Sequence, residues 1–203
     1  MSPPPSRPHS RSGSPVPGRV VRVLSVHQPW ADGLCLGWKP VENRTWETPY
    51  RGRIYIHATR LESRPRPEQL APRPPEVISE ILGHWSRPGP RQTGAILGSV
   101  ELVDIVPLGW VREIDRQIQA GTPTHLFLPP LAQRWVHAGA TFERLARVEQ
   151  QIRPLSERGP GHVFSLYLGP ECWLVDQPRL LPRPIFTKGK LNLWRFELPP
   201  HAE

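Results

Sequence analysis

Four side chains of different chemistry stand close together in the stretch GWKPVENRTW, residues 37–46: Lys39, Glu42, Arg44 and Trp46. In an extended chain, side chains alternate between two faces, so Glu42, Arg44 and Trp46 share one face and Lys39 stands at the mouth of the strand. A carboxylate between two cations stays ionised and orients them through charge-assisted hydrogen bonds. Two interpretations remain open. The cluster is either an ion pair that fastens the strand, or the floor of a groove where cations meet phosphate and the indole stacks on a base.

The rare lysines single out the same stretch and one other. The chain has 26 Lys and Arg residues, and three of these are lysine, at positions 39, 188 and 190. Lysine is a compact point charge whose pKa shifts readily, whereas arginine is a planar fork, so the two are not interchangeable at a tight site. We therefore expect Lys39, Lys188 and Lys190 to mark functional positions, although chance clustering of so few residues is the alternative.

Positive charge is concentrated at the two ends of the ordered region. Residues 19–60 hold seven basic and three acidic side chains, and residues 179–195 hold five basic and none acidic, whereas residues 76–178 hold nine basic and eleven acidic ones. This distribution is typical of a surface that binds a polyanion, although a biased genome would explain the total of +8 equally well.

The elements that must position these residues can be read from the pattern. We expect strands at 20–26, 41–46, 51–58 and 95–106, and at 162–168, 172–176 and 191–198. A short helix should open at HQPW and end at Gly37, and a second should span 76–85. Residues 110–157 are interpreted as a helical insertion with its best helix at 131–152. This order predicts an α+β, mostly β fold: a small antiparallel barrel decorated with helices.

Composition limits the remaining classes. Residues 1–18 are rich in Pro, Ser and Arg and are expected to be disordered, and residues 61–75 read as a Pro/Arg linker. There is no secretory signal and no apolar run long enough for a membrane span. Two cysteines without CxxC spacing indicate no disulfide framework, so we expect a reduced cytoplasmic location. We also expect a monomer.

Several blocks resemble one family. GWKPVENR is similar to the G-x-K-x-x-E-x-R signature of the ASCH domain (activating signal cointegrator 1 homology), in the PUA-like superfamily. HQPWADGL, RTWETPYRGRIYIHA, ILGSVELVDIV and PIFTKGKLNLW resemble further family blocks in the same order. The resemblance covers residues 19–198, with about 110–160 unmatched.

The resemblance implies a PUA-like barrel whose cleft, beside the first helix, binds RNA or DNA. The carried-over positions at the signature are Lys39, Glu42 and Arg44, with Gln28, Trp30, Trp46 and Arg53 around it, and Lys188 with Gly189 closing the barrel. Arg51 and Lys190 complete the candidate binding set.

Two other functions remain as alternatives, and the first is a small hydrolase that acts on a modified nucleoside or on RNA. Some ASCH-like proteins are amidohydrolases that deacylate N4-acetylcytidine, with the signature lysine, a central-strand glutamate and a threonine nucleophile. The matching residues here would be Lys39, Glu101 and, at the threonine position, Glu42, which is a poor substitute for an activated hydroxyl. Glu101 is expected either to pair with Lys39, the reading we favour, or to act as an acid with a raised pKa. The other alternative is a protein-interaction module of a larger transcription or translation complex. We expect no metal site, because no His/Cys/Asp set has ligand spacing, and no cofactor.

Overall fold

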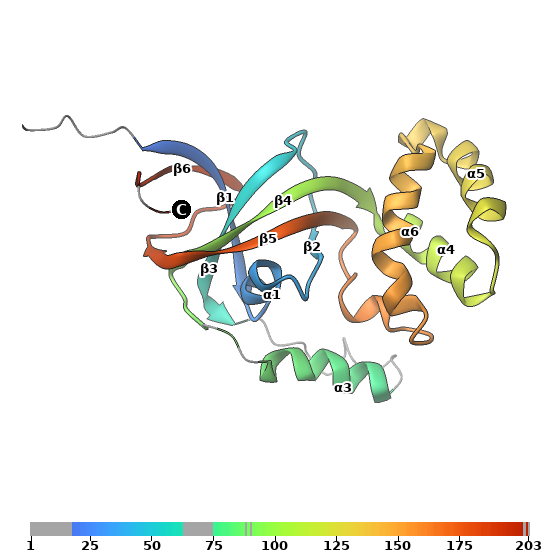
Figure 1. Cartoon of the computed structure of the whole chain (residues 1–203), viewed down its shortest axis with the longest axis horizontal. Coiled ribbons are helices and arrows are strands. Elements are labelled where there is room, and N and C mark those ends of the chain that lie inside the picture. Colours follow the sequence, from blue (N-terminus) through green and yellow to red (C-terminus); the bar gives the residue numbers. More distant parts are fainter. Residues whose placement is uncertain (1–17, 63–74, 88, 90, 201, 203) are drawn as a thin grey trace, which may run out of the picture.

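The computed structural model describes residues 18–62, 75–87, 89, 91–200 and 202 (Figure 1). The expected disordered tail, except Gly18, lies outside these residues, as does the expected linker apart from its first two residues and its last one. Six strands form one sheet and five α-helices surround it, so the α+β class is confirmed.

The sheet is mixed rather than antiparallel. Its strands, in spatial order, are β2 (Val41–Arg44), β5 (Glu171–Phe186), β4 (Ala95–Pro107), β3 (Gly52–Glu62), β1 (Arg19–Gln28) and β6 (Leu193–Leu198). β1 pairs with β3 in parallel, and the other neighbours are antiparallel.

The expected barrel is not confirmed, because the sheet is open: no pairing joins its edge strands β2 and β6 within the described residues. β2 has four residues, too few to continue the ladder around the circle. A side chain spans part of the gap instead, since the Arg44 guanidinium donates to the Ser25 carbonyl of β1 at 2.7 Å.

Helix α1 (Trp30–Leu36) packs against β1, β3, β4 and β5. Ala31 and Leu34 from this helix share a core with Leu24, Ile56 and Trp173 of the strands. The helix ends as expected at Gly37, whose φ of 83° is the left-handed conformation that glycine adopts without steric cost.

The segment between β4 and β5 is helical and lies at one end of the sheet (Figure 1). It contains α4 (Leu108–Gln119), α5 (Thr124–Arg134), α6 (Phe142–Ser156) and the 3₁₀ turns Val136–Ala138 and Val163–Ser165. Helix α3 (Pro75–Gly83) is followed by the 3₁₀ turn His84–Ser86 and contacts the 3₁₀ turn Val163–Ser165. In the described part of the chain, no helix combines the length and apolar character that crossing a bilayer requires.

Three local expectations were wrong. The single helix at 131–152 is two helices, because Gly139 adopts a φ of 73° and Thr141 caps α6 by accepting from the Arg144 amide. The segment 162–168, expected as a strand, contains the 3₁₀ turn Val163–Ser165, and its Val163 and Tyr167 pack in the helical core. The strand at 41–46 ends at Arg44, so the alternation does not extend to Trp46.

Candidate functional site

A buried charged cluster is formed by Lys39, Glu42 and Arg44. The Lys39 ammonium is 2% exposed; it donates to the Val41 carbonyl and lies 2.9 Å from Glu42 Oε2. The second carboxylate oxygen of Glu42 lies 3.1 Å from the Arg44 guanidinium. β2 therefore places Glu42 between the two cations, as the alternation along the strand predicted for these residues.

The cluster is electrostatically coupled. Burial by itself would raise the pKa of Glu42, but the adjacent Lys39 and Arg44 outweigh it and hold that pKa below its usual value. Burial lowers the pKa of Lys39, against the opposing effect of the Glu42 carboxylate. The glutamate is thus ionised, and its two oxygens fix the positions of both cations.

Trp30 links this cluster to an aromatic group. The Lys39 ammonium lies 5.6 Å from the Trp30 ring centre, within cation–π range. On its other sides the indole packs against Trp38, His84 and Trp85, with ring centres 5.0–6.2 Å apart. Burial lowers the pKa of His84 to about 4, so this part of the group is uncharged near neutral pH.

Two cavities meet beside the cluster. The smaller, about 290 Å³, is lined by Trp30, Lys39, Glu42 and Asn43, and by the leucines 166 and 168. The larger, about 970 Å³, opens over the ends of β1, β3 and β5. Ser25, His27 and Arg44 line both cavities, which are therefore adjacent, and we call the two together the groove.

The lysine turn, residues 187–192, forms one wall of the groove. The Ser25 hydroxyl donates to the Lys190 carbonyl at 2.9 Å, and His57 Nε2 lies 3.0 Å from the Thr187 carbonyl. Gly189 is so close to the His57 ring that a Cβ would come within 2.6 Å of it, so a larger residue does not fit there. The turn is therefore fixed, while Lys188 and Lys190 remain exposed.

Other predicted residues serve the fold rather than the groove. Gln28 is 1% exposed, and its amide donates to Asp32 and to the Gln92 carbonyl, which ties α1 to the loop that precedes β4. Trp46 packs edge-on against Trp173, with ring centres 4.6 Å apart, and does not line the groove.

Three further residues lie elsewhere on the sheet. Arg51 contacts Asp104 at 3.4 Å, near the helical segment. Arg53 lies 3.4 Å from Glu101, its neighbour across the β3–β4 ladder. The expected Lys39–Glu101 pair is therefore wrong: each residue has a different partner, since β2 and β4 are separated by β5.

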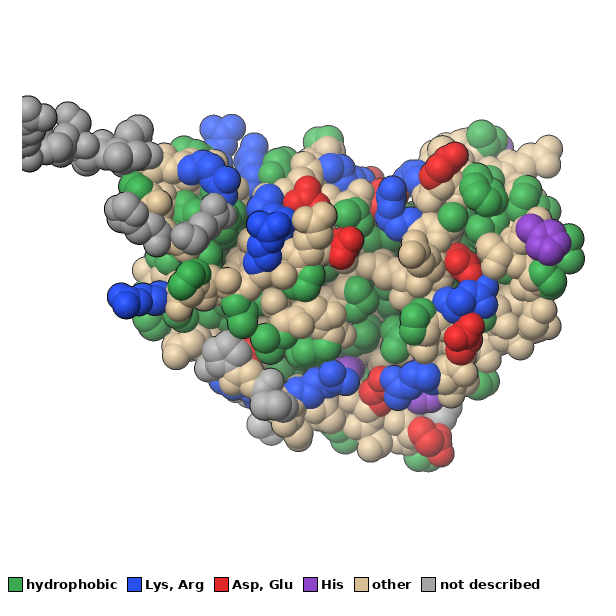
Figure 2. Space-filling model, in the orientation of Figure 1, with side chains coloured by type: hydrophobic (Ala, Val, Ile, Leu, Met, Phe, Trp, Pro, Cys, Tyr) green, Lys and Arg blue, Asp and Glu red, His purple; other side chains and the backbone are tan. Residues whose placement is uncertain are grey.

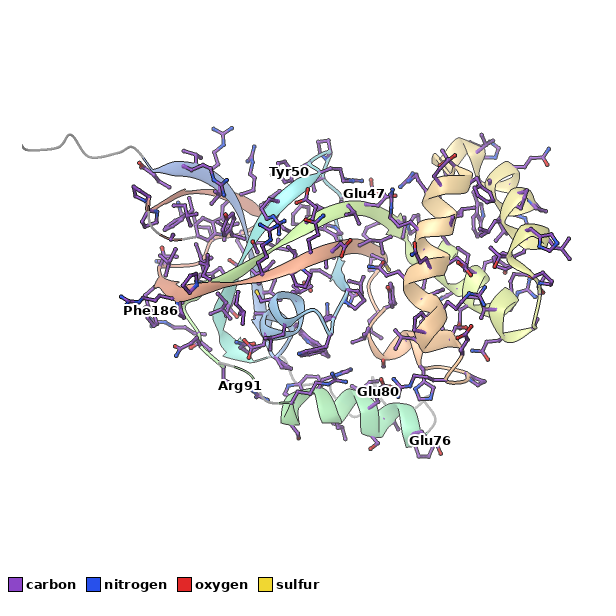
Figure 3. All side chains as sticks on the ribbon, in the orientation of Figure 1. Glu47, Tyr50, Glu76, Glu80, Arg91 and Phe186 are labelled. Carbon is purple, nitrogen blue, oxygen red and sulfur yellow. The ribbon has the colours of Figure 1, made fainter. Side chains whose placement is uncertain are left out.

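Sequence reasoning missed other residues that line the groove: His27, His57, Arg60 and Phe186. The alternation along β3 was a usable signal for His57, but nothing local placed it beside a turn 130 residues later. Phe186 is 71% exposed at the end of β5 (Figure 3), in a segment read only as family resemblance. Among the described residues, no group of three His, Cys, Asp or Glu side chains is arranged to hold a metal ion.

An open mixed sheet with a lysine, a glutamate and an arginine at its groove has the residues of one known domain signature. The family model of the ASCH domain matches residues 24–150, and the chain belongs to that family. Activating signal cointegrator 1 of Homo sapiens and its counterpart in Mus musculus are each 38% identical over 89 residues. Those residues are 40% of this chain but 14% of either relative, so the chain matches about a seventh of their length.

Proposed function

We propose that this chain is a nucleic-acid-binding module that holds a strand of RNA or DNA in the groove. The observation that carries the proposal is the charge along the groove. Arg60, Lys188 and Lys190 are exposed there and form no ion pair with another described residue. Glu42 is the one carboxylate among the described lining residues, and Lys39 and Arg44 already neutralise it. Such a surface attracts phosphate.

Two features favour a nucleic acid over a small anion. The larger cavity exceeds what one phosphate fills, and the exposed Phe186 ring at its rim offers a face on which a base can stack. The Arg44 guanidinium group belongs to a side chain that lines both cavities and is 23% exposed. It is a donor placed for an anionic oxygen.

The contacts of Lys39 do not favour the alternative, a hydrolase of a modified nucleoside. Its ammonium is held by Val41 and Glu42, and Glu101 pairs with Arg53 instead. A catalytic lysine of that kind would need a free face toward the substrate and a nucleophile beside it. We therefore assign Lys39 to organising the groove.

Fluorescence anisotropy with labelled single-stranded RNA, single-stranded DNA and duplexes tests the proposal. We expect binding at low salt that weakens steeply between about 50 and 200 mM salt. Lys188→Gln/Lys190→Gln should weaken binding about tenfold and lower the salt slope by about two, one for each phosphate contact. Phe186→Ala should weaken binding to single strands by about 1–3 kcal/mol.

The matched control is Arg112→Gln/Arg134→Gln, which removes the same charge from exposed positions on α4 and α5. Equal losses in the control and in the lysine variant would mean that only net charge matters. Absence of binding to every probe at low salt would refute the proposal.

A further inference from the structure

A second basic hollow lies at the other end of β1. It has a volume of about 370 Å³ and lies where β1 and β3 begin, beside β6. Its polar lining consists of four arginines and two tyrosines, which we call the arginine cluster: Arg19, Arg22, Arg53, Arg195, Tyr50 and Tyr55. Figure 2 shows several Lys and Arg side chains over this part of the sheet, and Figure 3 labels Tyr50 there. Arg22 is three residues before Ser25 of the groove, roughly 10 Å along the strand, and the two side chains leave opposite faces of the sheet.

Two of these arginines are placed directly against each other. Arg22 and Arg195 are register partners across the antiparallel β1–β6 ladder, so their side chains leave the same face of the sheet. Neither forms an ion pair with another described residue. Like charges in this arrangement destabilise a sheet, and an anion between them would remove that cost.

Hydrogen bonds and a cation–π contact fix the positions of side chains around the hollow. The Tyr50 hydroxyl donates to the Arg53 carbonyl at 2.9 Å, and its ring centre lies 5.8 Å from the Arg22 guanidinium. The Arg53 side chain donates to the Gln177 carbonyl at 2.8 Å.

The nearby carboxylates leave an excess of positive charge. Glu101 is paired with Arg53. Glu197, two residues beyond Arg195 on β6, is exposed and makes no ion pair with a described residue. Arg22 and Arg195 therefore have no carboxylate partner among the described residues. Guanidinium is the cation whose planar fork matches phosphate oxygens in a two-point contact.

We infer that the arginine cluster is a second phosphate-binding site, which holds the sugar–phosphate backbone of the same nucleic acid where the strand leaves the groove. The inference rests on the proposed function. The lysine turn of the groove leads directly into β6, which carries Arg195, and this position favours a nucleic acid because one strand can contact both basic regions. An anionic membrane would need apolar side chains to insert, and of the lining residues Val20 is the one exposed large hydrophobic.

The test uses the full chain and single strands of about 6 and about 20 nucleotides, near the lower and above the upper site size of a single-strand-binding domain. Arg22→Gln/Arg195→Gln should leave affinity for the short strand within about twofold. It should weaken binding of the long strand about tenfold and lower its salt slope by about two. Arg112→Gln/Arg134→Gln is again the matched control. Because the substitution removes like-charge repulsion, thermal denaturation should show an unchanged or raised midpoint.

Equal losses for short and long strands, or no loss for either, would overturn the inference. So would a loss confined to phosphatidylserine vesicles with oligonucleotide binding unchanged. Calorimetric titration with inorganic tripolyphosphate separates this inference from the proposed function. Binding that Arg22→Gln/Arg195→Gln abolishes and Lys188→Gln/Lys190→Gln spares supports the second site even if the groove binds no nucleic acid. The reverse pattern overturns it.

Discussion

Lys39 and the pair Lys188 and Lys190 line the same groove but differ in burial and in ion pairing. Lys39 is 2% exposed, paired with a carboxylate and bonded to a carbonyl, whereas the other two are exposed and form no ion pair with a described residue. A buried ion pair contributes to the shape of a site because breaking it leaves an uncompensated charge. An exposed, unpaired cation contributes little to stability but attracts a polyanion. Lys39 therefore stabilises the structure of the groove, whereas Lys188 and Lys190 are available to bind a ligand.

Glu42→Gln should have the largest effect. It leaves the buried Lys39 ammonium without its counter-charge, so the free energy of unfolding should fall by about 3–5 kcal/mol in urea denaturation followed by circular dichroism. Glu76→Gln, an exposed glutamate on α3 (Figure 3), is the control and should change little. A loss below about 1 kcal/mol for Glu42→Gln would show that the pair does not hold the groove together.

Trp46→Ala should follow. The Trp46 ring packs edge-on against Trp173, so removing the ring should cost about 3 kcal/mol of stability. Binding of nucleic acid by the folded protein should be unchanged, since the ring does not line the groove. Weakened binding with full stability would instead restore the base-stacking role expected from the sequence.

The difference between Trp46 and its neighbours shows where sequence reasoning stops. Alternation correctly put Glu42 and Arg44 on one face because both lie within β2, and it failed at the next even position because the strand ends at Arg44. A strand end is set by pairing with β5, more than 120 residues away, which no local pattern contains.

Local sequence patterns also predict some parts of the fold and not others. The strands around Val23, Ile54 and Val100 and the end of α1 at Gly37 follow from β-branched runs and one left-handed glycine. The parallel pairing of β1 with β3 is a property of topology, and so is the open edge that replaces the expected barrel. Likewise, the 162–168 segment was apolar enough for a strand, but its residues serve the helical core.

Arg44→Gln should lower both the stability of the protein and its affinity for nucleic acid. Arg44 belongs to the buried ion-pair cluster, and it is also partly exposed in the groove. Its guanidinium holds Glu42 and the Ser25 carbonyl, and it lines both cavities with 23% of its side chain exposed. We expect a loss of about 1–2 kcal/mol in unfolding free energy and a salt slope of binding lower by about one. Arg60→Gln is the matched comparison: it removes a groove charge that forms no ion pair with a described residue, so only binding should change. A loss of stability without a loss of binding in Arg44→Gln would mean that this residue stabilises the groove and does not contact the nucleic acid.

Lys188→Arg/Lys190→Arg should have the smallest effect on stability and on binding. Lys39→Arg is the contrasting variant. The bulkier fork must fit a buried space shaped for an ammonium group, so Lys39→Arg should lower the free energy of unfolding by about 1–3 kcal/mol. The exposed pair acts through charge, which arginine keeps, so stability should stay within about 0.5 kcal/mol. Affinity for nucleic acid should change by no more than about twofold, measured by anisotropy at fixed salt. A tenfold loss of affinity in Lys188→Arg/Lys190→Arg would mean that the turn presents compact ammonium groups to a specific ligand. Position 39 and positions 188 and 190 would then require lysine for the same reason, namely the compact shape of its ammonium group.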